Sequence, residues 1–93
     1  VNMEVKFWRT RQGDEVDFIL LKNRIPVPVE VKYRLSAPVV PDGMRKFLQT
    51  YVDAPFAFVF SKDDLGEVKC CGRPVRFLKW QDAEEIDYLR SVE

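Results

Sequence analysis

Residues 15–32 of this 93-residue chain read EVDFILLKNRIPVPVEVK and predict two antiparallel strands joined by a tight turn. The first strand is expected at about 15–21 and the second at about 26–33, with Asn23-Arg24 between them. Valines alternate with prolines and charged residues in the second strand, so one of its faces is apolar and the other carries the charges. The prolines favour an edge position or a frayed start for this strand.

The expected register places acidic residues opposite one another. With the turn centred on Asn23-Arg24, Asp17 lies directly opposite Glu30 and Glu15 lies opposite Lys32. Directly opposed residues have β-carbons about 4.5–5.5 Å apart, and like charges at that distance oppose pairing. At an effective dielectric constant of about 20, two unit charges about 4 Å apart repel by about 4 kcal/mol. A divalent cation between the two carboxylates would remove this repulsion.

Two carboxylates beside a lysine suit metal-assisted hydrolysis of a phosphodiester. Oxygen ligands select Mg²⁺ or Mn²⁺, and a neighbouring lysine can position the attacking water or stabilise developing negative charge. The alternative interpretation is a solvated hairpin face with alternating charges, which needs no ligand.

The remaining sequence predicts an α/β domain. The run Phe56–Phe60 is continuously apolar and is typical of a central strand that is covered on both faces. Apolar residues at helical spacing predict a helix at about 43–52, with Asp42 as its N-cap, and Asp82 with Glu85 predicts a capping box for a last helix at about 83–91. Further strands are expected at 3–9, 67–71 and 75–80.

Composition excludes several classes of function. The 15 basic and 15 acidic side chains balance, so a strongly basic nucleic-acid surface is excluded, and the absence of His excludes Ser-His-Asp or Cys-His catalysis within this chain. No apolar stretch approaches the roughly 20 residues that span a bilayer, so no transmembrane segment is expected. Cys70 and Cys71 are adjacent, a disulfide between them would be strained, and we interpret them as reduced and the protein as cytoplasmic.

Three motifs occur in order along the chain: Phe7-Trp8-Arg9-Thr10, then residues 13–20, then residues 25–32. Together they resemble the PD-(D/E)XK nuclease superfamily and, more narrowly, the nuclease-like domain that follows an AAA+ ATPase module in many bacterial and archaeal chains. The resemblance covers about residues 7–60. It implies an α/β restriction-endonuclease-like fold with a mixed sheet, and a metal-dependent nuclease that acts on DNA.

The resemblance also implies roles for individual residues. Asp17 and Glu30 would be metal ligands, the Val31 carbonyl would be an additional ligand, and Lys32 would be the catalytic lysine. Gln49 occupies a place where related nucleases often carry a Gln or Lys that faces the substrate, although an exposed helix face would carry the same residue.

The superfamily usually adds an acidic residue from a helix that precedes these strands, whereas this chain enters its first expected strand at residue 3. We therefore expect residues 1–93 to be a single nuclease-like domain of a longer chain, without that helix. The expected partners are DNA and the ATPase domain of the same parent chain. Phe77, Leu78 and Trp80 either cover a sheet edge or contact another domain or subunit. The alternative function is an inactive module of the same fold that binds nucleic acid or protein.

Overall fold

The hairpin predicted around Asn23-Arg24 is present in the computed structural model, which describes residues 3–85. Strands β2 (Glu15–Lys22) and β3 (Ile25–Val31) pair antiparallel in the expected register, from Lys22↔Ile25 to Phe18↔Val29. The two turn residues, Asn23 and Arg24, have φ angles of 53° and 66°. Left-handed values at both central positions define a type I′ turn, whose twist matches that of the paired strands.

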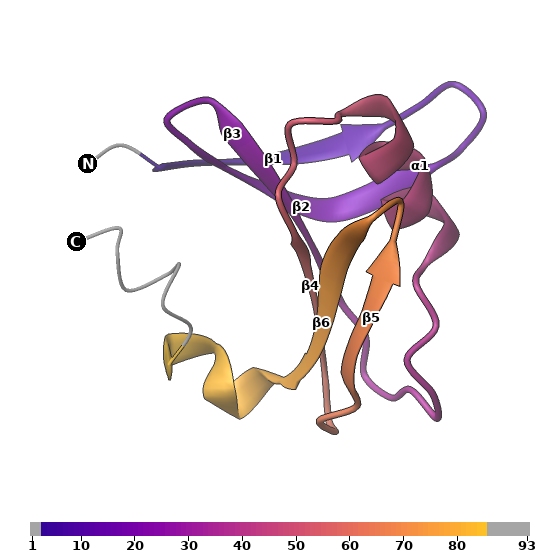
Figure 1. Cartoon of the computed structure of the whole chain (residues 1–93), viewed down its shortest axis with the longest axis vertical. Coiled ribbons are helices and arrows are strands. Elements are labelled where there is room, and N and C mark those ends of the chain that lie inside the picture. The colour runs from indigo at the N-terminus through magenta and orange to yellow at the C-terminus, as the bar shows by residue number, and fades with distance from the viewer. Residues whose placement is uncertain (1–2, 86–93) are drawn as a thin grey trace.

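The described residues form one six-stranded mixed sheet with an α-helix against one face, so the α/β class is confirmed (Figure 1). The strand order is β1-β2-β3-β4-β6-β5; the β3–β4 and β4–β6 pairs are parallel and the others antiparallel. The other elements are β1 (Met3–Arg9), α1 (Asp42–Thr50), β4 (Ala57–Ser61), β5 (Gly66–Cys70), β6 (Arg73–Lys79) and the 3₁₀ helix η1 (Trp80–Glu85).

The helix boundaries differ from those expected. The N-cap of α1 is Pro41 without a side-chain cap, so Asp42 is the first helical residue and not the capping residue. The Asp42 carboxylate still lies in the first turn, where its negative charge interacts favourably with the positive end of the helix dipole. Of the helix expected at 83–91, the structure describes only residues up to 85, which belong to η1; the remainder lies outside the described residues.

The two prolines of β3 lie in an interior strand, so the expected edge position is wrong, whereas the expected frayed start is confirmed on the β4 side. Pairing with β4 begins only at Val29↔Phe58. The Lys32 N–H donates to the Phe60 carbonyl of β4, and N–H groups alternate in direction along a strand. The nitrogens of Pro26 and Pro28 therefore face the β4 side before pairing starts there, where a missing N–H costs no ladder hydrogen bond.

Apolar side chains cover both faces of the sheet. On the α1 side the core includes Val16, Met44, Leu48, Val59 and Phe77. On the opposite side it consists of Val27, Val29, Phe58, Phe60 and Leu78. All five residues of β4 are buried, so the expectation of a central strand covered on both faces is confirmed.

Candidate functional site

Two hydrogen bonds join Asp17 and Glu30 across the end of the hairpin. The Asp17 N–H donates to Oε1 of Glu30 over 2.9 Å, and the Val31 N–H donates to Oδ2 of Asp17 over 3.0 Å. Each carboxylate therefore accepts a hydrogen bond from the backbone of the opposite strand, immediately beyond the last regular pair of the ladder, Phe18↔Val29. The structure brings together the two acidic side chains that the register predicted. We call this arrangement the carboxylate clasp.

A β-bulge in β2 lies at the carboxylate clasp. Strands β1 and β2 pair Lys6 with Ile19 and Trp8 with Val16, so Asp17 and Phe18 together lie opposite Phe7. Because of the extra residue, Val16 and Ile19 both reach the core on the α1 side. Asp17 remains exposed between them. Bulges commonly re-aim side chains next to functional sites, and this one presents a carboxylate at the surface.

Glu30 is the buried member of the carboxylate clasp. It is 4% exposed and lies beside Val59 of β4. Burial raises the pKa of the Glu30 carboxyl, and the nearby Asp17 charge raises it further, against the lowering effect of the Asp17 N–H and of Lys32. The Lys32 ammonium lies 3.5 Å from Oε2 of Glu30, and its side chain is half-exposed. The predicted neighbourhood of Asp17, Glu30 and Lys32 is therefore present.

The carbonyl of Val31 faces the same side as Asp17. In a strand, the N–H and C=O of one residue point to the same neighbour, and the Val31 N–H donates to Asp17. No group of three or more His, Cys, Asp or Glu side chains that could hold a metal ion occurs among residues 3–85. The ligands available for a cation at the clasp are thus two carboxylates and a main-chain carbonyl.

Glu15 and Gln49 are not part of this arrangement. Glu15 forms an ion pair with Arg9 on β1 over 3.1 Å, instead of lying opposite Lys32 as expected. Gln49 is exposed near the C-terminal end of α1, and no described contact joins it to the clasp. The helix approaches β2 with its other end, because a Cβ on Gly43 would lie 1.9 Å from the Glu15 carbonyl oxygen.

Arg73 connects β6 with the end of α1, a structural role that the sequence does not predict. Its guanidinium donates to the carbonyls of Leu48, Tyr51 and Ala54 at the C-terminal end of α1. The helix has no basic residue in its last turn, so an arginine from β6 satisfies these carbonyls instead. This contact spans 19 to 25 positions in sequence, and no local pattern marks it.

Cys70 and Cys71 are free thiols, with their sulfur atoms 3.7 Å apart. Burial raises the pKa of the Cys70 thiol, and its hydrogen bond with Cys71 adds to this effect. The turn between β5 and β6 is formed by Cys71 and Gly72, both with positive φ.

These features define an α/β protein with a mixed sheet and a pair of strand-borne carboxylates beside a lysine. A family model described as Domain of unknown function (DUF4143) matches residues 1–72, and the chain belongs to this family. Domains of this family typically occur in proteins that contain an AAA ATPase. A search of the curated proteins found no match, and neither did a search of the solved structures. No helix within residues 3–85 is long and apolar enough to cross a membrane.

Proposed function

We propose that this chain is a Mg²⁺- or Mn²⁺-dependent nuclease domain of the PD-(D/E)XK type that hydrolyses phosphodiester bonds in DNA. It would act in the cytoplasm together with the ATPase domain of its parent chain. The observation that supports this most is the carboxylate clasp, in which a buried Glu and an exposed Asp converge beside Lys32. The antiparallel β1-β2-β3 meander followed through α1 by a parallel strand is also compatible with a restriction-endonuclease-like fold.

The residues present fit a hard divalent cation. Asp17, Glu30 and the Val31 carbonyl offer only oxygen atoms, which Mg²⁺ and Mn²⁺ prefer. Mg²⁺ commonly binds through one or two carboxylates and completes its shell with water and substrate phosphate, so two side chains are sufficient. When bound, such a cation polarises the phosphate and lowers the pKa of bound water.

The chain's own residues would then have distinct roles. The Asp17 and Val31 N–H groups hold both carboxylates in fixed orientations. Lys32 is exposed enough to reach a substrate while its ammonium stays near Glu30, so it would orient the water or stabilise negative charge that develops on the phosphate. Glu30 must be ionised to act as a ligand, so its raised pKa predicts that cation binding weakens as the pH falls towards that value.

Thermal unfolding with and without Mg²⁺ or Mn²⁺ tests the metal site. A cation at about 100 times its Kd stabilises the folded state by about 2.7 kcal/mol, so we expect a clear increase in Tm. Asp17→Asn should abolish the increase, because it removes the exposed ligand. Glu15→Gln is the matched control: it removes a carboxylate two residues away that pairs with Arg9, and it should leave the increase intact.

Cleavage of DNA by the full parent chain tests the role of Lys32. Lys32→Ala should lower the rate about hundredfold or more, as loss of one transition-state donor commonly does. Unchanged cleavage would remove Lys32 from the mechanism.

The rival hypothesis is an interaction module of the same fold without activity. It is favoured by the absence, within residues 3–85, of a third acidic ligand. The rival hypothesis holds if neither cation raises the Tm of the wild type while Asp17→Asn is more stable than the wild type. Asp17 and Glu30 would then repel each other without binding a cation.

A further inference from the structure

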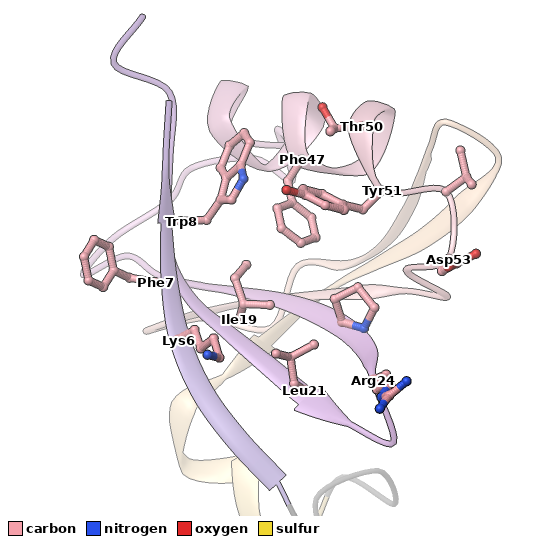
Figure 2. Close-up of a pocket in the computed structure, with 12 residues that line it drawn as sticks. Lys6, Phe7, Trp8, Ile19, Leu21, Arg24, Phe47, Thr50, Tyr51 and Asp53 are labelled. Carbon is pink, nitrogen blue, oxygen red and sulfur yellow. The ribbon is translucent and has the colours of Figure 1, made fainter. Parts of the chain in front are cut away.

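A hollow with a volume of about 410 Å³ lies on the α1 side of the sheet (Figure 2). Ile19 and Leu21 of β2 line its base, and aromatic side chains of β1 and α1 stand beside them (Figure 2). Its volume is within the range of pockets that hold small organic ligands. We call it the aromatic pocket.

Three rings form one side of the aromatic pocket. The rings of Trp8 and Phe47 meet edge to face with centroids 5.3 Å apart, and those of Phe47 and Tyr51 are 4.5 Å apart. Tyr51 is 41% exposed and Trp8 is half-buried, so both present ring surface to a ligand while Phe47 fixes them from behind. Exposed aromatic surface held in this way is a platform on which nucleobases stack.

Two cations line the aromatic pocket away from these rings, at separate places with Leu21 between them (Figure 2). Figure 2 shows Lys6 on β1 and Arg24 at the hairpin turn; Asp53, which follows Tyr51 in the chain, also lines the pocket. Lys6 is 3.7 Å from Glu4, but both side chains are more than half exposed, so this ion pair is weak and easily opened. Arg24 has no ion pair within the part of the chain that the structure describes. Each of these two cations is therefore available to a phosphate.

The backbone at Arg24 gives a separate reason to consider its side chain. With φ at 66°, Arg24 occupies the second central position of a type I′ turn, where Asn-Gly is the preferred pair. A residue with a Cβ is strained in this left-handed conformation, whereas glycine is not. The chain has an arginine despite this strain, and Arg24 lines the aromatic pocket.

The aromatic pocket adjoins the carboxylate clasp across β1. A smaller hollow of about 190 Å³ lies against Asp17, and Phe7 and Trp8 line both hollows. A strand of nucleic acid with a scissile phosphate near Asp17 can therefore place a neighbouring nucleotide beside Trp8. A base paired in a duplex cannot stack there, because its faces are covered by neighbouring bases.

We propose that the aromatic pocket binds one unpaired nucleotide of a single-stranded segment, with its base against Trp8 and Tyr51 and its two flanking phosphates near Lys6 and near Arg24. This inference rests on the proposed nuclease function for the direction of the strand towards Asp17 and for DNA as the substrate. Within that function it narrows the substrate class to single-stranded or frayed DNA.

Fluorescence titration tests this proposal in a Trp80→Phe background, where Trp8 is the only tryptophan. The probes are a short oligothymidylate, an abasic oligomer of equal length and thymidine monophosphate, all with EDTA so that no cleavage occurs. The oligothymidylate should quench Trp8 and bind about tenfold more tightly than the abasic oligomer, because stacking contributes about that factor per base. The monophosphate should bind more weakly than the oligomer, which would identify the strand as the ligand.

Arg24→Gly is the decisive variant. It should raise the Tm, because glycine removes the backbone strain in the turn. It should also weaken oligomer binding several-fold. The slope of the logarithm of the binding constant against the logarithm of the salt concentration should become shallower by about 0.7, the value for one phosphate contact on a single strand. Cys71→Gly relieves the other turn outside the pocket, and Lys69→Ala removes a distant charge; both should leave binding unchanged. Equal binding of abasic and thymidylate oligomers overturns the proposal, and so does unchanged oligomer binding in Arg24→Gly. The proposal is also overturned if unrelated peptides displace the bound oligomer and nucleotides do not.

The two proposals fail separately. If Mg²⁺ does not raise the Tm but Trp8 is still quenched by thymidylate through Arg24, only the metal site is refuted. If the cation raises the Tm and Trp8 is not quenched, only the aromatic pocket is refuted.

Discussion

At the scale of single residues, Glu30 is placed where a carboxylate costs stability. It is buried beside an apolar strand, and its hydrogen bond and its ion pair with Lys32 do not offset the loss of hydration. The pKa of its carboxyl is therefore raised. In the folded protein the Glu30 carboxyl therefore stays protonated to a higher pH than its ordinary pKa of 4.5 would allow. As the pH rises through this interval, the folded state binds more protons than the unfolded state, so this residue makes the protein less stable.

Glu30→Gln should be more stable than the wild type at pH 7, since a neutral amide keeps an oxygen for the Asp17 N–H. The difference in unfolding free energy should shrink as the pH falls and disappear below about 4, where Glu30 is protonated in both states. Urea titrations across this pH range give the measurement. A Glu30→Gln variant that is less stable than the wild type at every pH would show that the ion pair with Lys32 outweighs burial.

At the scale of elements, the contact between α1 and β2 depends on a glycine that helix propensity would disfavour. A side chain at Gly43 would meet the Glu15 backbone at its carbonyl oxygen, 1.9 Å from the added Cβ. Backbone atoms cannot move aside as the end of a side chain can, so the helix itself would have to shift. The other end of α1 is tied to β6 by Arg73, which leaves little freedom for that shift.

Gly43→Ala should therefore destabilise the protein, although alanine is better than glycine in a helix interior by about 1 kcal/mol. Because Glu15 is two residues from Asp17, the same change should also weaken the response to Mg²⁺. Gln49→Ala on the exposed part of the same helix is the control and should leave stability almost unchanged. Chemical unfolding of both variants measures the effect; a more stable Gly43→Ala would refute the close approach.

At the scale of the whole molecule, one sheet carries two cores that share β4 and β6. Val75 is fully buried on the α1 side and Val27 is fully buried on the other. Since side chains from the same strands enter both cores, neither face can lose its packing independently of the other. The carboxylate clasp and the aromatic pocket are thus held by a single cooperative unit.

Val27→Ala and Val75→Ala should each lower the free energy of unfolding by about 1.5–3 kcal/mol. The transition should stay single in both variants, with tryptophan fluorescence and far-ultraviolet circular dichroism giving the same midpoint. Two separated transitions in either variant would show that the faces unfold independently.

The hairpin, its register and the meeting of Asp17 with Glu30 could all be predicted from the order of the residues. These features follow from local causes: a two-residue turn sets which residues are opposed, and alternation sets which face they share. The central position of β4 could also be predicted from a local pattern, since the continuous apolar run Phe56–Phe60 favours a strand covered on both sides.

The construction of the clasp and of the pocket, in contrast, depends on contacts between distant segments. Glu30 is buried because β4 lies beside it, and the bulge at Asp17 arises from the pairing of β2 with β1. The aromatic pocket requires rings that β1 and α1 contribute from well-separated parts of the chain. The separation of Gln49 from the clasp and the contacts of Arg73 have the same origin. Local patterns specify turns and faces, whereas burial, electrostatic environment and hollows arise from which distant segments pack together, and no short stretch of sequence contains that information.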